Sequence, residues 1–219
     1  MIKFEEVKKD DTIRTYIKQA DESLIALGFT EHSFAHVDKV SLTCKYILEK
    51  MGYDERTVEL AQIAGYLHDI GNVINRIDHA QSGAVMAFRL LDKMGADAKD
   101  IAIIINAIGN HDESTAFPVN AVSAALIIAD KTDVRRSRVR SRDTISFDIH
   151  DRVNYSVKNS KIYINDENTS ITLELEIDTN YSSVIEYFEI FLDRMMLCNK
   201  AAQRLNLKFR LIINDNQVM

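Results

Sequence analysis

The stretch Ala64-Gly65-Tyr66-Leu67-His68-Asp69-Ile70-Gly71-Asn72 is the part of the sequence that decides the fold and the site. It closes an apolar helical pattern with two metal-competent side chains, His68 and Asp69, just before a glycine that ends the helix. Further residues of this kind lie near one end of other helical apolar stripes: His36, His79, His111 and Asp130. We therefore predict that these six side chains meet in one site.

The structural alternative treats each histidine as an ordinary core or surface residue. That interpretation suits any one of them, but it requires a separate hydrogen-bond partner for every group. Burying a polar group without a partner costs on the order of a few kcal/mol, and an isolated carboxylate costs more. A bound metal cluster satisfies all six together, so the whole set favours a metal site.

The donor set also indicates the kind of metal. Four imidazoles and two carboxylates suit Mn, Fe, Co, Ni or Zn better than Mg or Ca, which prefer oxygen. Six protein ligands exceed what one ion takes while keeping a position for water, so we expect two metals that share Asp69. Such a pair activates water and favours hydrolysis of a phosphate ester. Our candidate catalytic residues are Asp69, His111 and Asp130.

With His36, His68-Asp69 and Asp130, the chain resembles the HD superfamily of metal-dependent phosphohydrolases over roughly residues 30–142. The segment Ile128-Ala129-Asp130-Lys131-Thr132-Asp133 is similar to the closing aspartate helix of that family. The resemblance implies a helical bundle around the metal centre, with His36, His68, Asp69 and Asp130 as ligands of the first metal. His79 and His111 match the positions that hold a second metal in dinuclear branches, and the pattern is most similar to the ribonuclease Y catalytic domain.

Two positions depart from the family pattern. Asn72 stands where the family often has lysine, and Asn110 precedes His111 where several dinuclear members have paired histidines. Asn72 argues against a phosphate-binding lysine at its position, and because of Asn110 we expect the second metal to be held less tightly.

The composition is that of a globular protein with a real core. The chain has 219 residues, of which 46% are hydrophobic and 27% charged, and a net charge of −6. A single proline favours long helices, and the acidic balance argues against general nucleic-acid coating. Cys44 and Cys198 are expected to be buried free thiols. The N-terminus lacks the apolar core of a signal peptide and no stretch suits a membrane span, so we expect a cytoplasmic protein without a membrane partner.

Apolar periodicity predicts helices up to about Arg142 and a change of character after it. The predicted helices are Thr12–Leu27, Ser33–Met51, Glu55–His68, Asp78–Met94, Asp100–Ile108 and Val119–Val134. Beyond them we expect strands at Arg152–Asn159, Lys161–Asn165, Ile171–Ile177 and Lys208–Ile213, with a helix at Ser182–Asn206. The fold class is therefore mainly α: a helical HD-type domain, residues 1–145, and a small α+β subdomain, residues 146–219, with an antiparallel sheet and one helix.

Several further residues are candidates for substrate binding. Arg135, Arg136, Arg138, Arg140 and Arg142 form a basic run after Asp130, and guanidinium groups bind phosphate oxygens in pairs. We select Arg135 and Arg136 as the best of the run, together with Lys131 and Asn110; the alternative for the arginines is a solvated face or ion pairs with the nearby aspartates. His32 and His150 are interpreted as surface residues, and the pair His150-Asp151 is rejected as a second site.

The sequence thus predicts hydrolysis of a nucleotide, or of another small phosphate ester or diester, by metal-activated water. Three alternatives stay open: a non-hydrolytic di-iron oxygenase, a regulatory protein that binds a nucleotide without turnover, and a small ribonuclease, which keeps RNA open as a partner. The apolar face of the Ser182–Asn206 helix forms either core or a homodimer contact.

Overall fold

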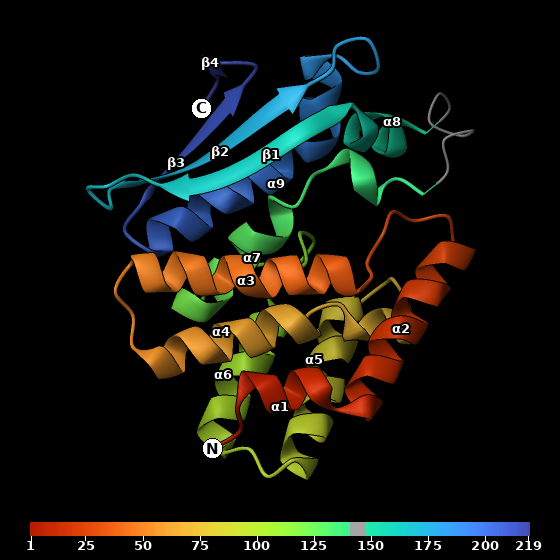
Figure 1. Ribbon diagram of the computed structural model, residues 1–219, viewed down its shortest axis with the longest axis vertical. Coiled ribbons are helices and arrows are strands. Elements are labelled where there is room, and N and C mark those ends of the chain that lie inside the picture. Colours follow the sequence, from red (N-terminus) through yellow and green to blue (C-terminus); the bar gives the residue numbers. More distant parts are fainter. Residues whose placement is uncertain (141–147) are drawn as a thin grey trace.

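The computed structural model describes residues 1–140 and 148–219 (Figure 1). Within residues 1–140 the chain is helical: α1 (Phe4–Lys9), α2 (Asp11–Ala26), α3 (Phe34–Lys50), α4 (Glu55–Leu67), α5 (His79–Lys93), α6 (Ala98–Gly109) and α7 (Ala121–Lys131). Short 3-10 turns, η1 (Ile70–Val73) and η2 (Arg136–Arg138), follow α4 and α7. The predicted helices of this part are confirmed to within a few residues.

Capping explains where these helices begin. Asp10, Ser33, Asp54, Asp97 and Asn120 each precede a helix, and each side chain accepts a hydrogen bond from a backbone N–H of the first turn. The helices then pack through continuous apolar stripes, and α7 is buried along most of its length. Cys44 and Cys198 are buried free thiols, as expected.

The C-terminal part consists of α8 (Ile149–Ser156), β1 (Val157–Ile164), β2 (Ser170–Ile177), α9 (Val184–Arg204), β3 (Lys208–Ile213) and β4 (Asn216–Gln217). Figure 1 shows the sheet at one end of the molecule, above α9 and α3. The strands lie in the order β1-β2-β3-β4. A helical part followed by a small α+β part confirms the predicted fold class.

Two predictions about this part were wrong. Residues 152–156 belong to α8, because Asp148 caps the first turn of a helix there, and the two expected strands are one continuous strand, β1. The sheet is also not wholly antiparallel. β1 and β2 pair antiparallel, but β2 and β3 pair parallel, because α9 carries the chain back across the sheet before β3 begins.

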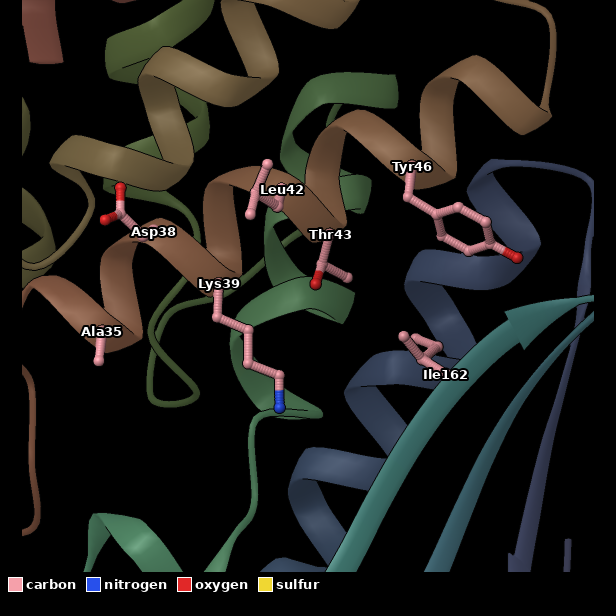
Figure 2. A pocket seen from close by; sticks show the side chains of 7 residues that line it. All are labelled: Ala35, Asp38, Lys39, Leu42, Thr43, Tyr46 and Ile162. Carbon is pink, nitrogen blue, oxygen red and sulfur yellow. The ribbon is translucent and has the colours of Figure 1, made fainter.

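The two parts of the chain are in close contact. α9 packs on α7, and the hydroxyl of Tyr46 on α3 accepts a hydrogen bond from the backbone N–H of Ile164 on β1. A groove of about 470 Å³ lies between α3 and β1, and Figure 2 shows Leu42, Tyr46 and Ile162 along it. The expected boundary at residues 145/146 and Arg142 lie outside the described residues. Within the described residues, no helix combines the length and apolar character that crossing a membrane requires.

Candidate metal centre

Every one of the six predicted ligands stands at or near a helix end. His36 lies in the first turn of α3, and Asp130 is the penultimate residue of α7. His68 is the C-cap of α4 and Asp69 follows it; His79 begins α5, and His111 follows α6. The structure brings all six side chains together.

Helix ends also orient the histidine rings. The last carbonyl groups of a helix lack intrahelical partners. Nδ1 of His68 donates to the carbonyl of Gly65 at 2.8 Å, and Nδ1 of His111 donates to that of Ile108 at 2.6 Å. His79 Nδ1 donates to the carbonyl of Arg76 at 3.0 Å. A ring that is protonated on Nδ1 presents the lone pair of Nε2, so each of these histidines is set to bind a cation.

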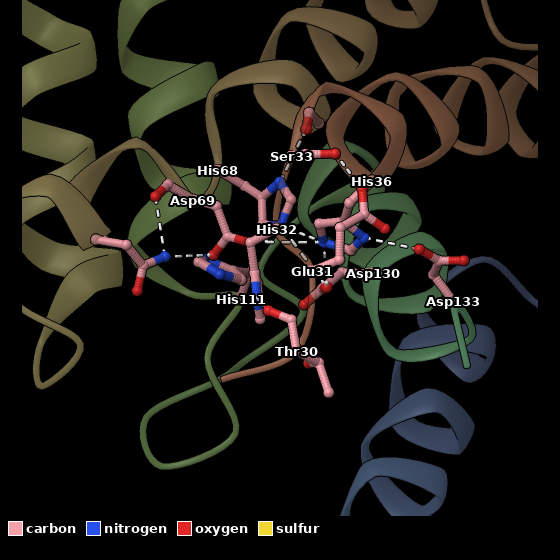
Figure 3. Close-up of polar contacts among 12 residues, drawn as sticks. Thr30, Glu31, His32, Ser33, His36, His68, Asp69, His111, Asp130 and Asp133 are labelled. Atoms are coloured by element: carbon pink, nitrogen blue, oxygen red, sulfur yellow. Dashed lines mark hydrogen bonds and ion pairs between the residues drawn. The ribbon is translucent and has the colours of Figure 1, made fainter. Parts of the chain in front are cut away.

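His36 is oriented by a carboxylate instead. Its Nδ1 lies 2.8 Å from Oδ2 of Asp133, which is buried, and Figure 3 shows His36 between Asp133 and His68. Lys39, Arg135 and Arg138 surround the same carboxylate. Burial by itself raises the pKa of Asp133, but the hydrogen bond from His36 and the charge of Arg138 hold it well below its usual range. Asp133 therefore stays ionised and supports the ligand.

The Nε2 atoms meet in two pairs. His36 and His68 approach to 3.3 Å, and His79 and His111 to 3.2 Å. Two nitrogen lone pairs at that distance need a cation or a proton between them. Ligand atoms of His36, His68 and Asp130 lie within 4.8 Å of one another, as do those of His68, Asp69 and His111, so both triads could hold a metal ion.

Asp69 lies between the two histidine pairs. Its Oδ2 is 3.3 Å from Nε2 of His68 and 3.6 Å from that of His36, while Oδ1 is 3.5 Å from Nε2 of His79. Asn72 donates to Oδ1 at 2.9 Å. Oδ2 is buried and accepts no hydrogen bond from any described residue. A buried carboxylate oxygen that lacks a hydrogen-bond partner and faces imidazole nitrogens fits coordination to a cation, so the residues present suit divalent transition metals.

The electrostatics indicate the same need for positive charge. Burial lowers the pKa of His68, but Asp69 and Asp130 outweigh burial and raise it to about 10. His111, which is also buried, has its pKa lowered to about 3 by burial and by the charge of His68. Burial raises the pKa of Asp130, yet Lys131, 2.7 Å away, and His36 hold it well below its usual range. The two carboxylates thus remain ionised and draw a proton onto His68.

A cavity of about 450 Å³ opens over Asp69, His79 and Asp130. Four cations line it, Arg76, Lys131, Arg138 and Arg194, and so do the carboxylates of Asp148 and Asp151. Lys131 was predicted for substrate binding and does line the cavity; the other three cations come from the loop before α5, from η2 and from α9. Phe29 and Phe191 line it as well, so cations and aromatic rings surround the same space.

The sequence interpretation missed His32. It was expected on the surface, but it is half-buried, lines this cavity, and its ring centre lies 5.5 Å from that of His36. Its Nδ1 donates to the carbonyl of Thr30 at 2.7 Å, which leaves Nε2 as an acceptor in the neutral ring. The four-residue spacing from His36 was the available signal. His150 is exposed, as expected, yet His150 and Asp151 also line the cavity.

Three of the predicted substrate-binding residues do not line this cavity. Arg135 pairs with Asp133 and Glu31, and Arg136 stacks on Tyr155 and Tyr181. Asn110 caps α6 and its amide donates to the carbonyl of Asn106. The basic run is therefore divided: Arg138 reaches the metal centre, while Arg135 and Arg136 line a different cavity.

Comparison with known proteins identifies the central part of the chain. Residues 33–137 match the HD domain family. A curated protein of Methanocaldococcus jannaschii, the uncharacterized protein MJ1020, is 25% identical over 75% of this chain and 72% of its own length. The crystal structure of a predicted HD superfamily hydrolase from an uncultured Thermotogales bacterium is 27% identical, with a TM-score of 0.45, over 57% of this chain and 67% of that one.

Proposed function

We propose that this chain, whose residues 33–137 form an HD domain, is a metal-dependent phosphohydrolase that acts on a small phosphate ester, with nucleotides as the favoured class. One observation carries the proposal. A cluster of four histidines and two carboxylates opens into a cavity lined by four cations, which suits a substrate that carries phosphate.

The ligands divide naturally between two ions. His36, His68 and Asp130 would hold one, His79 and His111 the other, and Asp69 would be shared, because its two oxygens face the two histidine pairs. Divalent metals in such a site lower the pKa of water and polarise phosphoryl oxygens. The remaining roles belong to the residues of the chain itself.

Arg138 and Lys131 are positioned to neutralise phosphoryl oxygens. Arg138 is buried and fixed, because Nε donates to the carbonyl of Glu31 and Nη1 to that of Asp133, each at 2.9 Å. Lys131 is buried as well, and it is held between Asp130 at 2.7 Å and Glu113 at 3.3 Å. Cations that are already in place cost little reorganisation when negative charge develops on the substrate.

The organic part of the substrate would lie against guanidinium groups that stack on aromatic rings. Arg76 covers the ring of Phe29 at 5.7 Å, and Arg194 covers that of Phe191 at 4.6 Å. Stacked arginine and phenylalanine pairs offer flat surfaces beside positive charge, which suits a nucleotide base and its phosphate. The cavity volume of about 450 Å³ is in the range of small-ligand sites.

The test combines elemental analysis with a substrate panel. The purified full chain is supplied with Mn, Fe, Co or Ni and offered nucleoside monophosphates, cyclic nucleotides, dinucleotides and RNA. We expect bound transition metal and hydrolysis of at least one ester, reduced at least ~100-fold in Asp69→Asn, which removes the shared ligand. Asp92→Asn, an exposed carboxamide substitution on α5, is the matched control.

Two results would contradict the proposal. The first is a metal-loaded chain that cleaves no phosphate ester, particularly if the iron form consumes oxygen. The second is cleavage that continues unchanged in Asp69→Asn.

A further inference from the structure

A second cavity lies apart from the metal centre. It has a volume of about 570 Å³ and is lined by Lys39 of α3, by residues that follow α7, and by Tyr155 and the start of β1. None of its lining residues lines the cavity over Asp69. Ligands that fill it would therefore touch both the helical part of the chain and the C-terminal part.

The lining of this cavity is strongly basic. Lys39, Arg135, Arg136 and Lys158 line it, and no carboxylate of residues 1–140 or 148–219 does so. The chain as a whole has a net charge of −6, so this concentration of cations is local. We propose that the cavity is a binding site for a phosphate group, carried by a small molecule of up to nucleotide size or present as free phosphate.

Charge balance around the cavity supports an anionic ligand. Behind the lining, the carboxylates of Asp133, Asp178 and Glu31 pair with these cations and with Arg138. The four cations of the lining thus share three carboxylates among the described residues, an excess of one positive charge, and Arg138 adds a further positive charge behind Asp133 although it lines the cavity over Asp69. A phosphate group carries about −1.5 to −2 at neutral pH, so this lining attracts it.

Two arginines are already held in place for such a ligand. Arg136 donates through Nε to the carbonyl of Tyr155 at 2.6 Å and stacks on that ring at 4.5 Å. Its Nη1 donates to no residue that the structure describes, so those N–H groups are available to a ligand in the cavity that Arg136 lines. Arg135 is fixed by Nε on Asp133 and by Nη1 on the oxygen of Ser137, which leaves the Ser137 hydroxyl proton free to donate.

Two lysines complete the site. Figure 2 shows the Lys39 side chain extending from α3, and Nζ lies 2.8 Å from Oδ1 of Asp133. Nζ of Lys158 lies 3.3 Å from Asp178. Each ammonium has three donors, and each side chain remains partly exposed. Both can therefore donate to a phosphate as well as to the carboxylate. Asp133 also forms a hydrogen bond with His36, so the phosphate would bind next to the carboxylate that orients this candidate metal ligand.

The test is equilibrium dialysis of the full chain with inorganic phosphate and, separately, with AMP. We expect saturable binding of at least one probe, weakened at least about tenfold by Lys158→Glu and by Lys39→Met. Lys161→Glu, on an exposed position of the same strand, is the matched control and retains the affinity. Tighter binding of AMP identifies an organic phosphate as the ligand, and equal affinity identifies free phosphate.

The same measurement in Asp69→Asn separates this site from the metal centre. We expect Asp69→Asn to bind phosphate or AMP at the second cavity with the wild-type affinity, whether or not the chain proves to be a hydrolase. The proposal is overturned if neither probe binds saturably, if Lys158→Glu and Lys161→Glu bind equally, or if Asp69→Asn alone abolishes binding. Thermal unfolding followed by circular dichroism confirms that each variant is folded. If Lys158→Glu does not fold, the affinity of Lys39→Met still tests the proposal.

Discussion

Oδ2 of Asp133 lies 2.8 Å from Nδ1 of His36, and both side chains are buried. The hydrogen bond fixes the ring so that Nε2 faces His68 and Asp130, at 3.3 Å from each. Three cations keep Asp133 ionised. A residue outside the ligand set thus determines how one ligand is presented.

Replacing Asp133 with asparagine should weaken metal binding without removing a ligand. The amide keeps the size of the side chain but loses the charge that holds His36 in the required tautomer. Loss of such a supporting contact typically costs about 10–100-fold in metal affinity. Competition with a chromogenic chelator measures the change, with Asp92→Asn as control. Equal affinity in both variants would show that His36 does not depend on Asp133.

Replacing His111 with alanine should lower the metal content from two ions per chain to one. His111 faces His79, whereas the triad of His36, His68 and Asp130 does not include it. Elemental analysis after dialysis against excess metal gives the stoichiometry. His150→Ala, at the rim of the same cavity, should retain two ions. Identical content in wild type and His111→Ala would contradict a second ion at this position.

Arg194→Met should raise KM for the phosphate ester while leaving metal content unchanged. The guanidinium lines the cavity from α9 and is held by Glu113. Methionine keeps much of the length but removes the charge, and hydrogen bonds to charged groups contribute about 1.5–3 kcal/mol, or roughly tenfold and more in affinity. Steady-state kinetics compare the KM of Arg194→Met with that of the control Arg204→Met, which is exposed at the end of α9 and should keep the wild-type KM. An unchanged KM would remove Arg194 from the substrate site.

Gly71→Ala should be strongly destabilising. A Cβ at Gly71 would lie 2.0 Å from the carbonyl oxygen of His79 and 2.5 Å from the backbone nitrogen of Gly83. Because backbone atoms cannot move aside cheaply, we expect a loss of about 3 kcal/mol or more in the free energy of unfolding. Gly109→Ala, whose Cβ would meet only Ala84 at 3.7 Å, should change it by less than about 1 kcal/mol. Urea titrations compare the two, and equal stabilities would contradict the close approach.

Glu186→Gln should make the melting temperature less dependent on pH between pH 4.5 and 2. The backbone N–H of Ser183 and the guanidinium of Arg152 hold the pKa of Glu186 at about 2, against 4.5 for an ordinary glutamate. A lowered pKa contributes stability above pH 4.5 and loses it as the pH falls through 2. The difference in Tm between wild type and Glu186→Gln should therefore shrink between pH 4.5 and 2. Glu189→Gln, exposed on the same helix, is the control, and a difference that does not vary with pH would contradict the assignment.

Periodicity could predict the helices and the ligand set because both depend on local spacing. The six ligands follow apolar stripes that end where helices end, so the same pattern locates the helix and its last polar residue. His32 escaped this reasoning because it precedes α3, although it lies four residues before His36. Arg194 reaches the cavity only through tertiary packing, and nothing in its neighbouring residues indicates it. Arg76, by contrast, lies three residues before His79, and that spacing was an available signal.

The remaining differences have equally physical causes. The segment Arg152–Ser156 alternates like a strand, but the cap at Asp148 starts a helix through it. The parallel pairing of β2 and β3 could have been predicted, because a long helix between two strands returns the chain to the end of the sheet at which the first strand began. The division of the basic run could not, because Arg136 is turned away by Tyr155 and Asp178, which lie far along the chain.

The crossover helix α9 has an evolutionary consequence. All six candidate ligands come from residues 36–130, whereas Phe191 and Arg194 line the cavity from α9. In the proposed phosphohydrolase, mutations on α9 would therefore alter which ester is accepted while the candidate ligands stay unchanged. A lineage of such enzymes would acquire new substrates through its C-terminal third and still inherit the same reaction.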